Sequence, residues 1–64
     1  MVPDEPLGEV LFEFHAIGNA VKVTAVQAST GIEASIVGSA QAPRRQLELT
    51  ALAKLRYVLK QTKR

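Results

Sequence analysis

The sequence of 64 residues contains no cysteine and no tryptophan, and it has a single histidine. Without cysteine the chain forms no disulfide and no thiolate metal site, and one imidazole excludes a site built from several histidines. No apolar run approaches the about 18 residues of a transmembrane helix, so we expect no membrane partner. The acidic, proline-containing start lacks the basic and apolar regions of a signal peptide. The sequence therefore predicts a cytoplasmic protein.

Residues that carry catalysis or bind metals are equally sparse. His15 has no serine or carboxylate placed with it in the pattern of a catalytic triad. Glu9, Glu13 and Glu33 match no known cation-binding loop, and no glycine-rich phosphate loop joins a strand to a helix. The sequence predicts a protein that is not an enzyme, with no catalytic residue, no metal site, no cofactor and no small-molecule ligand.

The composition is that of a small globular domain, since 47% of the residues are hydrophobic. A chain this short builds a core close to the smallest that folds alone. Association with another chain would bury further apolar surface and add stability. We expect residues 1–8 to form a flexible N-terminal tail, because Pro3, Pro6 and Gly8 interrupt regular structure there. We expect residues 9–62 to form one domain and residues 63–64 to be a frayed basic C-terminus.

Alternation of apolar and polar residues predicts two strands joined by a tight turn. Residues 9–17 alternate strictly, and residues 20–28 are rich in valine and threonine. The pair Gly18-Asn19 between them is suited to a two-residue hairpin turn, which sets Phe14 opposite Val23 and Leu11 opposite Val26.

A third strand and a helix complete the predicted fold. A turn closing around Thr30-Gly31 predicts a strand over residues 32–37 that ends at Gly38, with Ala25 opposite Ile36. Pro43 suits the first turn of a helix that continues to about Thr62. The predicted core comes from the inner sheet face and one helix stripe: Val10, Phe12, Phe14, Val21, Val23, Ile36, Leu47, Ala51, Leu52, Leu55, Val58 and Leu59. The fold class is therefore α+β, a three-stranded antiparallel meander with one C-terminal helix packed on one face (β-β-β-α).

The outer sheet face is not cleanly polar. Four apolar residues point to this face, which a single helix cannot reach: Leu11, Ile17, Val26 and Val37. The sequence predicts Leu11 and Val26 as cross-strand neighbours, with Ser35 next in the same row. A contiguous apolar patch favours a protein partner or self-association, for instance a homodimer with two sheets packed across a two-fold axis. The alternative is that these residues favour strand formation and are merely exposed.

The net charge of +2 divides between the two parts of the chain. Residues 1–42 carry one base against five acids, and residues 43–64 carry seven bases against one acid, which gives −4 and +6. The side of the helix opposite the core stripe contains Arg45, Arg56, Lys60 and Lys63. Such a stripe binds phosphates, so an accessory nucleic-acid binder is the second hypothesis, less favoured than protein binding. The alternative is a solvated face that keeps the protein soluble.

Three parts of the sequence carry a resemblance to known proteins. They are Glu-Val-Leu-Phe-Glu-Phe-His-Ala-Ile-Gly-Asn-Ala-Val-Lys-Val-Thr-Ala at residues 9–25, Thr30-Gly-Ile-Glu through Ile-Val-Gly38, and Leu52-Ala-Lys-Leu-Arg-Tyr-Val-Leu59. Over about residues 9–60 the chain resembles small uncharacterised proteins of alphaproteobacteria, a domain family of unknown function. The resemblance implies a bacterial cytosolic protein and transfers no functional residue.

Overall fold

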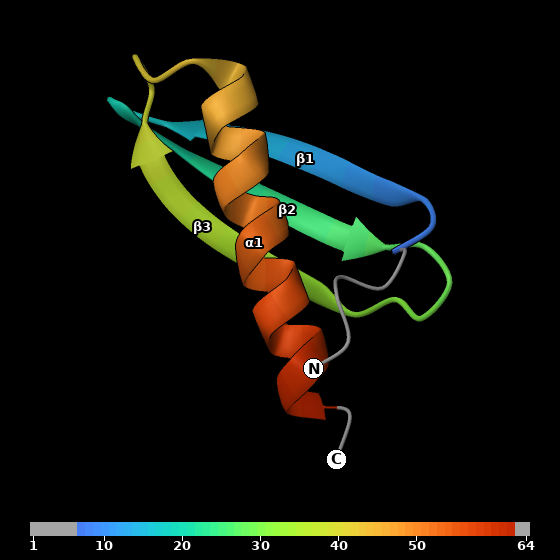
Figure 1. The fold of residues 1–64 in the computed structure, drawn as a ribbon. Helices are drawn as coiled ribbons and strands as arrows, with labels where there is room; N and C mark the ends of the chain where they lie inside the picture. Colours follow the sequence, from blue (N-terminus) through green and yellow to red (C-terminus); the bar gives the residue numbers. More distant parts are fainter. Residues whose placement is uncertain (1–6, 63–64) are drawn as a thin grey trace.

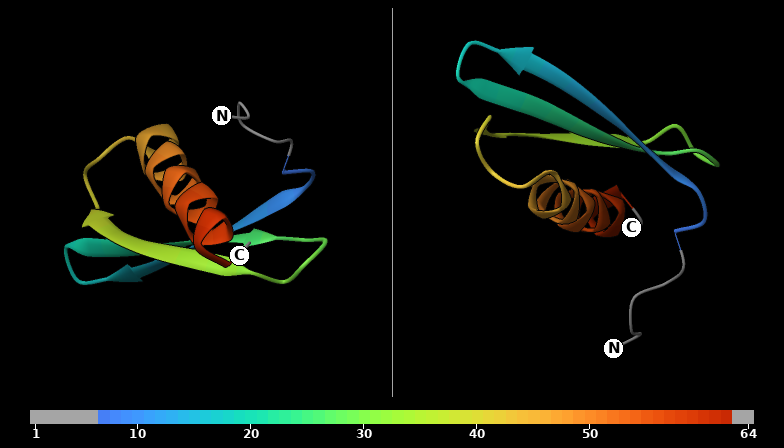
Figure 2. Two further views of the ribbon diagram at one scale, coloured as in Figure 1. Left: turned by 60° about the horizontal axis from the view of Figure 1, so that its bottom comes forward. Right: turned by 90° about the horizontal axis from the view of Figure 1, so that it is seen from above.

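Three strands and one helix make up residues 7–62, the part of the chain that the computed structural model describes. The elements are β1 (Val10–Ile17), β2 (Ala20–Gln27), β3 (Glu33–Ser39) and α1 (Arg44–Thr62) (Figure 1). The sheet is antiparallel with the order β1-β2-β3, and α1 lies across one of its faces (Figure 2). The predicted α+β fold is confirmed.

The ends of the chain were predicted to be a flexible tail and a frayed basic end. Residues 1–6 and 63–64 lie outside the described residues, so the structure describes only the inner edge of the first segment, residues 7–8. At that edge Leu7 packs against the core, and its carbonyl accepts a hydrogen bond of 3.1 Å from the Gln27 side chain.

The first hairpin has the predicted register. Phe14 lies opposite Val23 and Leu11 lies opposite Val26, with Gly18 and Asn19 forming the turn. The apolar alternation and the turn length required the same pairing, and a slip of one residue would have moved the phenylalanines to the outer face.

The register of the second hairpin was predicted wrongly, by two residues. Ala25 lies opposite Ala34, and Ile36 lies opposite Val23 instead of Ala25. Side chains alternate with a period of two, so a shift of two residues leaves Ile36 on the predicted face. The core therefore keeps the predicted residues, while the cross-strand partners between β2 and β3 change on both faces of the sheet.

A loop longer than predicted causes this shift. The Gln27 amide donates to the Ile32 carbonyl at 2.9 Å, so residues 28–31 all belong to the loop. Within it the Thr30 hydroxyl donates to the Gln27 side chain at 2.8 Å, and Gly31 has a φ of +77°. That backbone conformation is open to glycine and strained for most other residues, which fixes where the loop turns back.

The core lies between α1 and the inner sheet face. The buried residues are Val21, Val23, Ala25, Ala34, Leu47, Ala51 and Leu55. The other predicted core residues are partly buried and pack against them: Val10, Phe12, Phe14, Ile36, Leu52, Val58 and Leu59. The helix packs mainly on β2 and β3, and Figure 2 shows the hairpin end of β1 leading away from it. The inner side of β1 is therefore only half covered. No helix within residues 7–62 is long and apolar enough to cross a membrane.

Gly38 was predicted to end the third strand, which is wrong. The strand continues to Ser39, and Gly38 lies opposite Val21 on the side that faces the helix. A β-carbon at position 38 would lie 2.5 Å from Cδ2 of the buried Leu47. The glycine therefore allows the first turns of α1 to approach the sheet closely.

Candidate interaction site

The four apolar residues predicted for the outer face lie there, but in separate places. Leu11, Ile17 and Val37 are 50%, 56% and 69% exposed, and Val26 is half-buried. Leu11 neighbours Val26 at one end of the sheet, and Ile17 neighbours Ala20 at the other. The exposed Val37 lies beside Lys22.

A polar row separates the two ends of this face. Glu13, Thr24 and Ser35 lie side by side across the three strands. Thr24 is only 8% exposed, and its hydroxyl shares a hydrogen bond of 2.8 Å with the Ser35 hydroxyl. The prediction that Ser35 follows Leu11 and Val26 in one row is wrong, because the second register differs and Glu33 occupies that place. The apolar residues of this face therefore do not form one contiguous patch.

The outer edge of the sheet on the β1 side is open. The Glu9 carbonyl accepts a bond of 3.0 Å from the Ala28 amide, and Ile17 pairs with Ala20 at the two-residue turn. Antiparallel pairs alternate, so odd-numbered residues of β1 direct their amide and carbonyl groups towards β2. The even-numbered residues of β1, from Val10 to Ala16, direct theirs to the edge. No strand within residues 7–62 pairs with this edge.

The edge on the β3 side is partly occupied. The Gln27 amide bonds to the Ile32 carbonyl, so even-numbered residues of this segment face β2 and Ser35 faces the edge. The ammonium group of Lys54 reaches over from α1 and donates to the Ser35 carbonyl at 2.8 Å. A lysine placed there hinders the approach of another strand, which leaves β1 as the more accessible edge.

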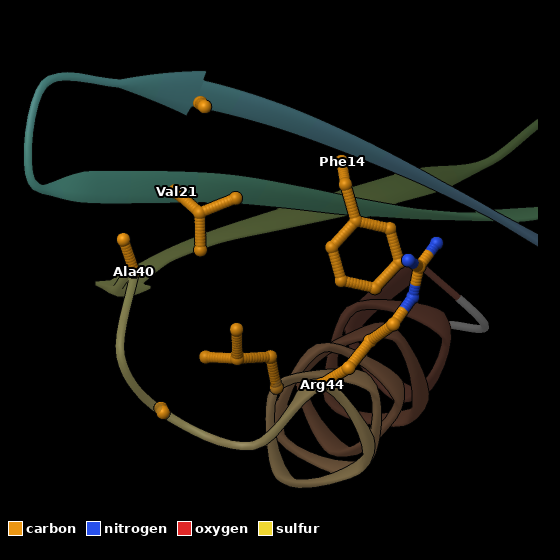
Figure 3. Close-up of a pocket in the computed structure, with 7 residues that line it drawn as sticks. Phe14, Val21, Ala40 and Arg44 are labelled. Carbon is orange, nitrogen blue, oxygen red and sulfur yellow. The ribbon is translucent and has the colours of Figure 1, made fainter.

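A hollow on the inner side opens where α1 begins (Figure 3). It has a volume of about 240 Å³ and is lined by Phe14, Ala16, Val21, Ala40, Ala42, Arg44 and Leu47. The guanidinium carbon of Arg44 lies 4.1 Å from the centre of the Phe14 ring. Arg44 is the only ionisable residue among those that line the hollow. The sequence gives no local signal for this contact, because Arg44 and Phe14 are 30 positions apart.

The basic helix face is partly as predicted. Arg45 and Lys60 are exposed and Arg56 is half-buried, whereas Lys63 lies outside the described residues. Two large apolar side chains, Leu49 and Tyr57, are exposed on the same helix. The exposed surface of α1 therefore combines cations with apolar groups.

The acidic residues and the histidine are dispersed. No group of three or more His, Cys, Asp and Glu side chains within residues 7–62 is close enough to hold a metal ion. Glu13 pairs with Thr24 across the strands, and His15 pairs with Lys22.

Comparisons with known proteins identify a family without an assigned activity. A family model described as "Domain of unknown function (DUF6898)" matches residues 7–62, which is the whole described part of the chain. No curated protein and no solved structure matches the chain. The match agrees with the resemblance to an uncharacterised domain family, and the alphaproteobacterial source stays a prediction.

Proposed function

The chain belongs to the family described as a domain of unknown function (DUF6898), and we propose that it is a small protein-interaction module that associates with a copy of itself. One observation carries the proposal: α1 covers β2 and β3, and β1 is left as an open edge with apolar side chains on both faces.

The exposed groups of β1 support association in two ways. Leu11 and Ile17 present apolar surface outwards, while Phe12 and Phe14 are only half-buried on the inner side. Burying such surface stabilises a complex by roughly 25 cal/mol for each Å² removed from water. An open strand edge adds unpaired backbone groups that a second strand satisfies.

The proposed module is non-enzymatic and cytoplasmic. The hollow beside α1 is lined by apolar groups and one cation, Arg44, which lies over the Phe14 ring, and no second titratable group is among the residues that line it. Nucleophilic catalysis typically pairs the nucleophile with an activating base within hydrogen-bonding reach, and the lining of this hollow offers no such pair. The lack of cysteine suits a reducing compartment.

Sedimentation equilibrium over a wide range of protein concentration tests the proposal, with the NMR rotational correlation time as a second readout. We expect the apparent mass to rise from that of one chain towards that of two as the concentration approaches millimolar. A mass and a correlation time that stay at the monomer values throughout would exclude self-association.

The helix supports a second candidate function, accessory nucleic-acid binding through Arg45, Arg56, Lys60 and Lys63. The supporting observation is that Arg45 and Lys60 are exposed near Leu49 and Tyr57, in a segment with a net charge of +6. Titration with an oligonucleotide at low salt should shift amide resonances of α1 but not those of the sheet, and raised salt should reverse the shifts. Unchanged helix resonances at low salt would remove this candidate.

A further inference from the structure

We propose that the second copy adds to the β1 edge, with β1 running antiparallel to β1 of the partner about a two-fold axis at Phe14. The result is a continuous six-stranded sheet with both helices on one face. This inference rests on the proposed self-association and specifies its geometry.

The backbone of β1 determines which residues can meet. The even-numbered residues direct their amides and carbonyls to the open edge, and only such positions form hydrogen-bonded pairs with a second strand. The same residues, among them Phe12 and Phe14, carry the inward side chains. Opposed residues of an antiparallel pair point to the same side of a sheet. The inner faces of the two copies therefore lie on the same side, and the two helices with them.

The side chains of β1 favour one register among those that the backbone permits. With the axis at Phe14, the two Phe14 rings are opposed and Phe12 lies opposite the partner's small, exposed Ala16. On the outer face the Glu13 carboxylate lies opposite the partner's His15, and Leu11 lies opposite the partner's Ile17. Each of these pairs matches aromatic with aromatic, large with small, acid with base, or apolar with apolar.

The neighbouring registers lack this complementarity. An axis at Glu13 opposes two carboxylates and sets Leu11 against the partner's His15. An axis at His15 opposes the two imidazoles and sets Glu13 against the partner's Ile17. Opposed carboxylates repel each other, and a polar side chain set against an apolar one gives no favourable cross-strand contact, so both arrangements are disfavoured.

The proposed register also accounts for the divided outer face. Leu11 and Ile17 lie the same number of residues from Phe14 along β1. The two-fold axis therefore places Leu11 of one chain beside Ile17 of the partner chain. The patch of Leu11 and Val26 then continues into Ile17 and Ala20 of the partner. Each of the two apolar patches of one chain thus joins the other patch of the partner, which gives two equivalent combined patches across the interface.

Three exposed apolar residues provide matched variants that should all fold. Leu11→Lys and Ile17→Lys place a charge in the proposed interface, and Val37→Lys makes the same change on β3 outside it. We expect the first two to raise the dimer dissociation constant by about tenfold or more, because each change acts twice in a symmetric dimer. We expect Val37→Lys to leave it within about twofold. Dissociation by Val37→Lys with no effect of Leu11→Lys would overturn edge pairing while leaving self-association standing.

Cysteine cross-linking tests the register, because the natural chain has no cysteine. A mixture of Glu13→Cys and His15→Cys chains should oxidise to a mixed disulfide dimer much faster than either variant alone. Rapid homodimer formation by Glu13→Cys alone would overturn the axis at Phe14 in favour of one at Glu13. A wild-type chain that stays monomeric at every concentration would overturn the proposed function and this inference together.

Discussion

The guanidinium carbon of Arg44 lies 4.1 Å above the centre of the Phe14 ring, so the first residue of α1 covers an aromatic side chain of β1. The helix has no acidic residue in its first turn, and a positive charge there opposes the helix dipole. Arg44 also forms a long ion pair of 4.0 Å with Glu48, which contributes little at the surface. The contact with Phe14 is thus the main favourable interaction of Arg44, whose charge is unfavourable at the N-terminus of a helix.

Replacing the two adjacent arginines separates these effects. We expect Arg44→Gln to lower the free energy of unfolding by about 0.5 kcal/mol, because the loss of the cation–π contact exceeds the relief at the helix start. We expect Arg45→Gln to raise it by a few tenths of a kcal/mol. Urea unfolding of both variants measures the difference. Equal effects of the two changes would show that the contact with Phe14 contributes nothing.

Enlarging Gly38 should be costly despite the small size of the change. In Gly38→Ala the new β-carbon would lie 2.5 Å from Leu47 Cδ2, so the helix or the leucine must move. We expect a loss of about 1–3 kcal/mol, typical of overpacking. The control Val37→Ala, at an exposed neighbouring position, should cost about 0.5 kcal/mol.

A double-mutant cycle with Leu47→Ala identifies the cause of that loss. Removing the leucine side chain takes away the atoms that the new methyl group meets. The two changes together should therefore cost less than their separate losses added. Strict additivity would mean that the clash is not what destabilises Gly38→Ala.

The outer face contains a hydrogen bond whose two partners should respond unequally to removal. Thr24 is buried and Ser35 is half-buried, and their hydroxyls are 2.8 Å apart. We expect Ser35→Ala to cost about 1–2 kcal/mol, because it leaves the Thr24 hydroxyl without a partner away from water. Thr24→Val should cost less than about 0.5 kcal/mol, since the Ser35 hydroxyl retains access to water and valine favours strands.

Combining the two changes checks that explanation. In the Thr24→Val, Ser35→Ala chain no hydroxyl is left unpaired, so its stability should approach that of Thr24→Val alone. Thermal unfolding of the four chains provides the coupling energy. A double variant as unstable as Ser35→Ala would point to lost packing instead of an unsatisfied hydroxyl.

These relationships show what the sequence was able to predict. The first hairpin was predictable because the alternation of residues 9–17 and the turn at Gly18-Asn19 demand the same pairing. The second hairpin was not, because alternation is insensitive to a slip of two residues and residues 28–31 can close as a short or a longer loop.

The candidate site was only partly predictable for a related reason. Exposure of Leu11, Ile17 and Val37 follows from their place in the alternation. How these residues lie relative to one another depends on the second register, and the half-open inner side of β1 depends on which strands the helix covers. The stacking of Arg44 on Phe14 and the close approach at Gly38 are contacts between distant segments that no local pattern records.

Amide hydrogen exchange along β1 distinguishes edge pairing from any association through the outer face. In the single chain the amides of Leu11 and His15 bond to β2, so their exchange is slow at every concentration. The amides of Phe12, Phe14 and Ala16 face the open edge and should exchange quickly in the monomer, then slow progressively as the dimer forms. Leu11→Lys should abolish that dependence on concentration while leaving the Leu11 and His15 positions protected. If the edge amides exchange at the same rate when the apparent mass has doubled, the second copy binds elsewhere than at β1.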